Sequence, residues 1–327
     1  MGWIFDASLQ GIIFAIMALG VYLTFRILDF PDLTVDGSFV TGAAVCTVMI
    51  VSGISPLIAT FSALIIGFVV GAITGILHTK GKINALLSGI LMMIALYSIN
   101  LRIMGLTSDS TPVVANLSLL GEDTVLTKVA DFFNNLGFIW GGHSWGLLFF
   151  LVLITFLFKF ILDLFLKTEV GLAIRATGDN KKMIRSFSAN TDSLIIIGVG
   201  ISNAFVAFSG AVMAQYYEFS NVNMGIGMIV IGLASVIIGE ALFGTKTIGR
   251  ITLAVILGSV IYRIVIGYAL QQQILDASDM KLVTAIIVIL ALVIPNILEK
   301  RRAKKRKMKR QHSLQRKAGA EEGKASA

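Results

Sequence analysis

The sequence has little charge: only 14% of its 327 residues are charged, whereas 56% are hydrophobic and the mean hydropathy is +0.87. A soluble domain of this size needs far more charge to cover its surface, so the composition excludes a water-soluble protein. The apolar residues form continuous runs and do not alternate with polar residues as they do in the strands of a transmembrane barrel, which argues against that fold. The composition therefore predicts an all-α polytopic integral membrane protein.

Residues that build disulfide, metal and nucleotide sites are scarce or wrongly spaced. The single cysteine, Cys46, lies inside an apolar run, which excludes an intrachain disulfide framework and a cysteine-rich metal site. The three histidines (His78, His143 and His312) are far apart and lack metal-ligand spacing. The nearest match to a nucleotide-binding loop, at 239–247, has threonine between its last glycine and the lysine. We expect no metal or cofactor on this chain, and no enzymatic activity of the chain alone.

Nine apolar segments are each close to the length that crosses ~30 Å of hydrocarbon. They lie at about 9–25, 35–52, 57–77, 83–101, 144–166, 194–217, 226–243, 251–270 and 282–298. Residues 1–6 contain no basic group, so the first run is interpreted as a retained span and not as a cleaved signal peptide. We predict about nine transmembrane helices, within a range of roughly eight to ten. They form a membrane domain at 1–298, which a basic, disordered tail follows at 299–327.

Charge in the connecting segments predicts the orientation. Nine lysines and arginines lie between 300 and 310, directly after the last apolar run, and predict a cytoplasmic C-terminus under the positive-inside rule. Nucleic-acid binding is the alternative for such a run, but no nucleic-acid-binding fold accompanies it. When the predicted spans are counted back from this cytoplasmic C-terminus, the segment 167–193, which has five basic and three acidic residues, lies on the inside. The loop 102–143 falls outside with two basic and four acidic residues. The N-terminus is then outside.

The connection between the first two spans departs from this pattern, because it carries three acidic residues at a cytoplasmic position. Pro31 forbids a continuous helix there, which predicts a broken or partly re-entrant segment near 29–37. Asp32 or Thr34 could cap the helix that follows, and Asp36 in its first turn would suit the positive end of its dipole.

The glycine pattern predicts a two-fold internal repeat. Residues 34–37, with Gly42 five positions further on, resemble residues 224–227, with Gly232 five positions further on. A second pair of glycines falls at similar offsets, Gly71 and Gly258. Many transporters are built from two copies of one helix set. Chance similarity among glycine-rich apolar segments is the alternative.

Polar residues inside the spans are candidates for a translocation path, because a polar group in hydrocarbon is costly unless it faces protein or a cavity. The candidates are Asp36, Ser38, Asn84, Ser88, Asn203, Ser209, Gln215 and Ser235, and the same polar set includes Asn100 and Ser202. Hydrogen bonding between helices is the ordinary role of such residues. Glu240 is expected to pair with Lys246 or Arg250, with a proton relay as the alternative. Isolated hydroxyl and amide groups favour an uncharged or zwitterionic solute over an ion.

A polar, net basic segment at 168–190 lies between two long apolar runs. Its sequence TEVGLAIRATGDN and the downstream SGAVMAQ resemble permease subunits of bacterial ABC importers of the branched-chain amino acid and ribose type. The resemblance is closest to the uncharacterised amino-acid-like branch, where LDFPDLTVDGSFVTGAAV also has a counterpart. It implies that residues 171–190 of this segment dock on an ATPase. The residues implied in coupling are Gly171, Leu172, Arg175, Ala176, Gly178, Asn180, Lys181 and Arg185.

The resemblance also implies partners and cargo. Separate ABC ATPase subunits would carry ATP and Mg²⁺, and a solute-binding lipoprotein or periplasmic binding protein would deliver solute to the outer face. Two permease copies, expected to be a homodimer, would form the path in the bacterial plasma membrane. An amino acid, branched-chain or aromatic, is the implied solute, with a sugar or nucleoside as the alternative. A stand-alone secondary transporter and a membrane scaffold are the rival functions, and neither explains the basic segment.

Overall fold

The computed structural model describes residues 2–107, 113–135, 137, 139–140, 143–187, 189–245 and 247–271, together with 282, 285–286 and 289. Residues 1–280 form one compact unit and 281–327 a second. The helices and strands given below all belong to the first unit. Apart from those four positions, the predicted span at 282–298 and the predicted tail at 299–327 lie outside the described residues.

Eight helical segments among the described residues are long and apolar enough to cross a membrane. They comprise α1 (Gly2–Tyr22) with the π-helix η1 (Leu23–Ile27), α2 (Thr34–Val51), α3 (Pro56–Thr79), α4 (Ala85–Gly105), α6 (Trp145–Phe165), α9 (Thr191–Tyr217), the 3-10 helix η2 (Val222–Gly225) with α10 (Met228–Phe243), and α11 (Ile248–Gln271). They coincide with the first eight predicted spans, so the polytopic all-α fold is confirmed.

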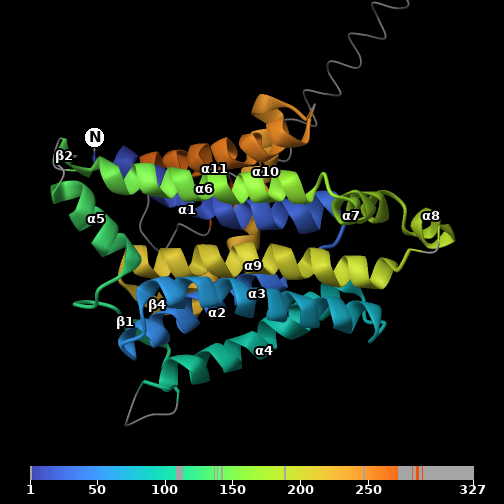
Figure 1. Cartoon of the computed structure of the whole chain (residues 1–327), viewed down its shortest axis with the longest axis horizontal. Coiled ribbons are helices and arrows are strands. Elements are labelled where there is room, and N and C mark those ends of the chain that lie inside the picture. The colour runs from blue at the N-terminus through green and yellow to red at the C-terminus, as the bar shows by residue number, and fades with distance from the viewer. Residues whose placement is uncertain are drawn as a thin grey trace, which may run out of the picture. The chain divides into compact units, whose positions relative to one another are not determined.

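Short elements connect these helices at the two ends of the bundle. They are β1 (Asn116–Ser118), α5 (Val125–Asn135), β2 (Ile139–Trp140), β3 (His143–Ser144), α7 (Glu169–Asp179), α8 (Lys181–Ser186) and β4 (Phe219–Asn221). β1 pairs with β4 and β2 with β3, both antiparallel. Figure 1 shows α7 and α8 at one end, and α5, β1 and the N-terminus at the opposite end.

Helices α1, α2 and α9 form the core. In their most apolar windows 72%, 78% and 83% of the residues are buried, against 28% for α4 and 22% for α6. A helix that is apolar on every side and enclosed by others needs no polar face, which explains why these three show no amphipathic pattern. The exposed apolar faces of α3, α4 and α6 suit contact with lipid or with another membrane chain.

The packing has a two-fold pattern that supports the predicted repeat. Helix α9 contacts α2 and α3, whereas α1 contacts α10 and α11 (Figure 1). A side chain at Gly42 on α2 would overlap the Ala207 carbonyl of α9, and one at Gly232 on α10 would meet Val21 of α1. The other glycine pair does not match, because Gly258 packs against α10. Only the first pair therefore occupies equivalent positions.

The predicted break between the first two spans is confirmed. The chain leaves η1 at Ile27, runs non-helically through 28–33 and starts α2 at Thr34. This entry segment (28–33) contains three fully buried side chains, Leu28, Phe30 and Asp32. The Asp32 carboxylate accepts hydrogen bonds from the Thr34 amide (2.9 Å) and from Nδ2 of Asn203 on α9 (2.6 Å). Burial raises the pKa of the Asp32 carboxyl above its usual range.

A second stretch without α-helix precedes α10. Residues 218–227 contain β4 and η2, and they bring the chain to the first turn of α2 before α10 starts. The two helix starts meet because the Asp36 carboxylate accepts from the amides of Gly227 and Ile229. Asp36 lies in the first turn of α2, as expected, and its carboxylate also caps α10. The amides at the start of α10 lie opposite its carboxylate, and in the predicted repeat that start would belong to the other half.

Candidate functional site

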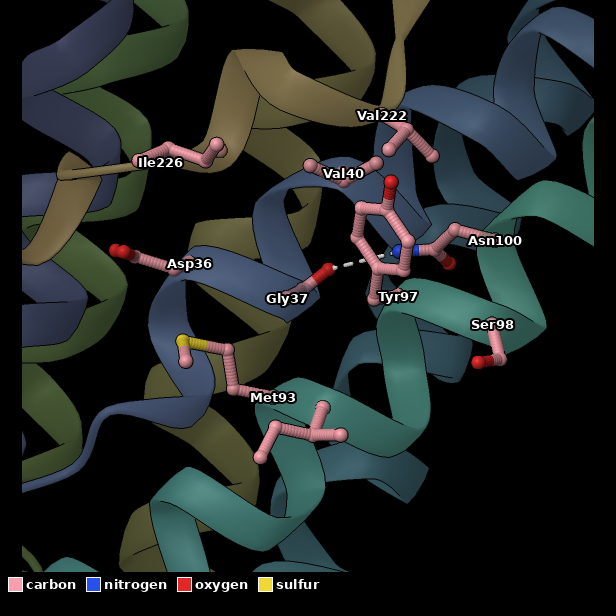
Figure 2. A pocket seen from close by; sticks show the side chains of 11 residues that line it. Asp36, Gly37, Val40, Met93, Tyr97, Ser98, Asn100, Val222 and Ile226 are labelled. Atoms are coloured by element: carbon pink, nitrogen blue, oxygen red, sulfur yellow. Dashed lines mark hydrogen bonds between the residues drawn. The ribbon is translucent and has the colours of Figure 1, made fainter. Parts of the chain in front are cut away.

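A pocket of about 530 Å³ lies between the start of α2, the middle of α4 and the stretch that leads into α10. Its volume is within the range of small-molecule sites, which is roughly 300–1,000 Å³. Figure 2 shows side chains from these elements around one space. The lining residues are Asp36, Gly37 and Val40 of α2, Met93, Ile94, Tyr97, Ser98 and Asn100 of α4, and Val222, Gly225 and Ile226.

Asp36 supplies the negative charge of this pocket. Its Oδ2 accepts from the Gly227 amide at 2.9 Å, and its Oδ1 accepts from the Ile229 amide at 2.8 Å. These bonds fix the carboxylate at the positive end of α10. The hydrogen-bonding capacity of the carboxylate is thus used at least in part by the start of α10.

Asn100 supplies an acceptor that has no protein partner. Its side chain is 1% exposed, and its Nδ2 donates to the Gly37 carbonyl of α2 at 3.3 Å (Figure 2). Its Oδ1 is buried and makes no hydrogen bond to any described residue. Buried polar atoms are nearly always paired, so this buried oxygen is an exception among the described residues.

The rest of the pocket is mainly apolar. Val40, Met93 and Val222 line it, and the ring of Tyr97 stands beside them (Figure 2). Tyr97 and Ile94 are half exposed or more, which places them at the mouth. None of the lining residues carries a positive charge. The pocket thus has mainly apolar walls, and its polar residues Asp36 and Asn100 lie on opposite sides of Gly37 (Figure 2).

Of the eight predicted path residues, only Asp36 lines this pocket. Four others join core helices or anchor a neighbouring segment, as the interhelical interpretation expects: Ser38 donates to Asn203 (2.6 Å), Asn203 donates to Asp32, Ser209 donates to the Ile13 carbonyl (2.8 Å), and Gln215 donates to Thr60 (2.7 Å). Ser202 likewise donates to the Gly20 carbonyl at 2.7 Å. These contacts hold α9 against α1, α2 and α3.

The remaining three bond within their own helix. Asn84 caps α4 through the Leu86 amide at 3.0 Å. Ser88 and Ser235 donate to carbonyls one turn back, both at 2.8 Å. Of the wider polar set, Asn100 alone joins Asp36 at the pocket.

Glu240 is paired, but with a different residue from those expected. Arg26 of η1 donates to both carboxylate oxygens, with Nε at 2.9 Å and Nη2 at 2.8 Å. Arg250 instead donates to the Phe243 carbonyl, and position 246 lies outside the described residues. The ion pair therefore joins η1 to α10.

The segment predicted to couple to an ATPase folds as α7 and α8. Several of its predicted residues have internal roles. A side chain at Gly178 would overlap the Ile27 carbonyl, and one at Gly171 would overlap the Phe165 carbonyl, so both glycines permit close packing. Asn180 caps α8 through the Met183 amide (3.1 Å). Arg185 binds Thr191 (2.9 Å) and Asp192 (3.3 Å) at the start of α9.

An apolar surface remains exposed on α7 and just beyond α8. The coupling surface, as we name it, consists of Val170, Leu172, Met183 and Phe187, which are 42%, 51%, 45% and 74% exposed. Lys182 is exposed beside it, while Arg175, Ala176 and Lys181 are half-buried. Large apolar side chains exposed next to a basic residue are typical of a protein contact site.

The inner side of α7 packs on the entry segment. Ile174 is fully buried in a cluster with Leu28, Phe30, Ile195 and Val199. Helix α7 therefore touches the same six-residue segment that leads into α2.

The sequence did not single out Met93, Tyr97 or Val222 at the pocket, nor Val170, Met183 or Phe187 on the coupling surface. These are ordinary apolar residues in apolar or amphipathic segments, and only their exposure or their position around a cavity distinguishes them. Among the described residues, no group of His, Cys, Asp and Glu could hold a metal ion.

The comparisons with known proteins agree with this architecture. The family model of the branched-chain amino acid transport system / permease component matches residues 3–293. The tyrosine transport system permease protein of Clostridioides difficile is 43% identical over 91% of this chain and 92% of its own length. The ribose import permease protein of Escherichia coli is 24% identical over 90% of this chain and 85% of its own.

A probable branched-chain amino acid transport permease protein of Methanocaldococcus jannaschii is 26% identical, over 72% of this chain and 74% of its own length. No solved structure gives a significant match. The fold, the matched length and these relatives agree: the chain belongs to the branched-chain amino acid transport permease family and is the membrane-spanning permease component of an ABC importer.

Proposed function

We propose that this permease imports an aromatic amino acid, with tyrosine as the first candidate. The proposal is supported by the similarity to a permease named for tyrosine transport, at 43% identity over nearly the whole of both chains. The mainly apolar pocket beside Tyr97 has room for an aromatic side chain. Branched-chain amino acids, sugars and nucleosides are the competing solutes.

ATP hydrolysis takes place on separate ATPase subunits that bind the coupling surface and carry ATP and Mg²⁺. The observation that carries this proposal is the contrast between the two sides of α7. One side exposes Leu172 to solvent, and the other buries Ile174 against the entry segment. A partner bound to the exposed side would therefore be linked, through α7, to the segment that leads to Asp36.

The end with α7 and α8 is cytoplasmic in this proposal, and the N-terminus and β1–β4 end is external. A solute-binding lipoprotein or periplasmic binding protein docks on the external end. Two permease copies assemble, and the exposed apolar faces of α3, α4 and α6 offer area for the contact. The path runs between the copies.

Docking is tested by co-purification of the permease with its ATPase. The changes Leu172→Asp and Lys182→Glu alter exposed positions and are expected to release the ATPase without lowering thermal stability. Lys128→Glu, an exposed charge reversal on α5 at the other end, is the matched control and should retain it. Retention of a coupled ATPase by both α7–α8 variants would show that docking occurs elsewhere.

The cargo is tested with the whole complex in proteoliposomes. Uptake of labelled L-tyrosine should require the binding protein and ATP, and should persist after ion gradients are collapsed. Unlabelled leucine, ribose and a nucleoside serve as competitors. Uptake that follows an ion gradient and ignores ATP would identify a secondary transporter instead.

A further inference from the structure

Helix α4 exposes polar side chains at a depth where lipid cannot form hydrogen bonds with them. Tyr97 is 50% exposed, and Ser98 beside it is exposed as well. At about 1.5 Å per residue, both lie roughly 10 Å or more from either end of α4, well inside the hydrocarbon that this helix crosses. The Ser98 hydroxyl makes no hydrogen bond with a described residue, whereas Ser88 donates to a carbonyl one turn back. Polar groups at this depth normally face protein or water.

The exposed faces of α3 and α6 differ from that of α4. Every exposed side chain of α3 from 57 to 76, and of α6 from 149 to 164, is leucine, isoleucine, valine or phenylalanine. Such faces suit lipid. Trp3, Trp145 and Tyr268 lie close to the ends of their helices, where aromatic residues of the membrane interface are usual. Tyr97 is too deep for that belt.

The α2–α4–α10 pocket opens on the same side of α4. Tyr97 and Ile94 stand at its mouth, and Ile226, which is 53% exposed, lines it from the stretch that leads into α10 (Figure 2). Helix α4 packs on α2, α3 and η2, and Figure 1 shows it at the edge of the bundle. A pocket that opens at this edge becomes enclosed when another chain covers its mouth.

We propose that a second copy of this chain packs on the α4 face around Ala95, Tyr97 and Ser98, and that the pocket opens into the space between the two copies. The presence of two copies rests on the proposed function, and the choice of α4 over α3 and α6 rests on the exposed polar residues. In a two-fold dimer the same patch meets itself. A hydroxyl is both donor and acceptor, so Ser98 is complementary to its own counterpart in the other copy. Ala95, on the same face, is small enough to allow close approach.

Two other occupants compete for this face. Lipid would cover its apolar residues but would leave the hydroxyls of Tyr97 and Ser98 unpaired. The chain's own predicted span at 282–298 is the second, and it would leave α4 unable to reach another copy. Neither alternative brings α4 of one copy close to α4 of the other.

The test is cross-linking of the whole complex in native membranes. Ser98→Cys exchanges one oxygen for sulfur, and Tyr97→Cys is the second variant. Ile65→Cys on α3 and Leu153→Cys on α6 are the matched controls, because these positions are 69% and 58% exposed and lie at a similar distance from a helix end. The natural Cys46 is fully buried, so the wild-type complex gives the background. A flexible bis-maleimide is added, and covalent dimers are measured on a denaturing gel.

We expect both α4 variants to give the covalent dimer in at least about tenfold higher yield than either control, because only the self-contacting face brings identical positions together. Dimers through Ile65→Cys or Leu153→Cys in place of the α4 variants would overturn the assignment. So would the absence of α4 dimers from a complex that contains two permease copies, whether lipid or the span at 282–298 covers the face.

The number of copies is measured separately, from the mass of the wild-type complex. A single copy would refute the proposed two-copy assembly and the α4 interface with it. Two copies without α4 dimers would refute the α4 interface alone. Tyrosine uptake by the wild-type complex judges the proposed cargo, and its failure would leave an α4 dimer in place.

Discussion

Arg26 and Glu240 join the end of the first span to α10 through a bidentate ion pair, in which the nearest nitrogen and oxygen are 2.8 Å apart. The side chain of Glu240 is only 11% exposed, whereas that of Arg26 is 60% exposed. Removing the arginine would leave a nearly buried carboxylate without its donor. That variant should lose more folding stability than one in which both partners are replaced.

Arg26→Ala is therefore expected to destabilise the protein more than the double change Arg26→Ala with Glu240→Gln. The single change should cost about 1–3 kcal/mol, the penalty for an unpaired buried acceptor. Thermal unfolding of the two variants, with Glu240→Gln alone to complete the cycle, measures the coupling. Additive effects of the two changes would show that the pair contributes nothing to stability.

Gly178→Ala is expected to lower thermal stability and to displace α7, because the added carbon would overlap the Ile27 carbonyl. Gly249→Ala is the matched control, since the carbon added there would be 3.4 Å from its nearest neighbour, a carboxylate oxygen of Asp163. The melting temperature of the permease without its ATPase separates this packing effect from docking. If the Gly178→Ala protein is as stable as the control, the predicted overlap with the Ile27 carbonyl is wrong.

The Asp32 carboxyl predicts a pH dependence. Burial raises its pKa in the folded protein, so the folded state holds the proton more tightly than the unfolded state. Stability contributed by this group is then fully present below its unfolded pKa of about 3.9 and is lost as pH rises through the folded value. The melting-temperature difference between wild type and Asp32→Asn should shrink as pH increases above about 4. A melting-temperature difference between wild type and Asp32→Asn that stays constant or grows as pH rises would contradict the prediction.

Cys46 is expected to resist thiol reagents in the folded protein, because it is fully buried and lies 3.3 Å from Nε2 of Gln215. Gln215 also accepts from the Val125 amide of α5 at 2.9 Å. Gln215→Ala should expose the thiol and increase its labelling rate severalfold. Ser209→Ala, on the same helix but bonded to α1, should not. Rapid labelling of the native protein would refute the buried position.

Much of the fold follows from the sequence because the bilayer imposes simple demands. A run such as 57–77 must be a spanning helix since it is apolar for the full hydrocarbon thickness. Pro31 marks the break before α2 for a local steric reason. These features depend on residues close together in the chain.

The candidate site could not be derived in the same way. Asp36 and Gly227 are far apart in sequence, and no local pattern indicates that one caps the helix of the other. Arg26 and Glu240 are also far apart in sequence. The prediction chose basic residues that are close to Glu240 in the sequence, and this choice was wrong. On α7 the helical spacing was evident, but its rotation against the bundle, which buries Ile174 and exposes Leu172, depends on the entry segment.

The non-helical segment from Leu28 to Asp32, in which Leu28, Phe30 and Asp32 are buried, also has a mechanical consequence. Ile174 of α7 touches one end of it, and Asn203 at the centre of the bundle is bonded to the other. We expect a displacement of α7 to act on this short segment as well as on α9, which α7 also contacts. Leu28 and Asp36 are only eight residues apart in the sequence. Few bonds therefore separate the α7 contact from the pocket, and few rotations are available to cancel a small displacement between them.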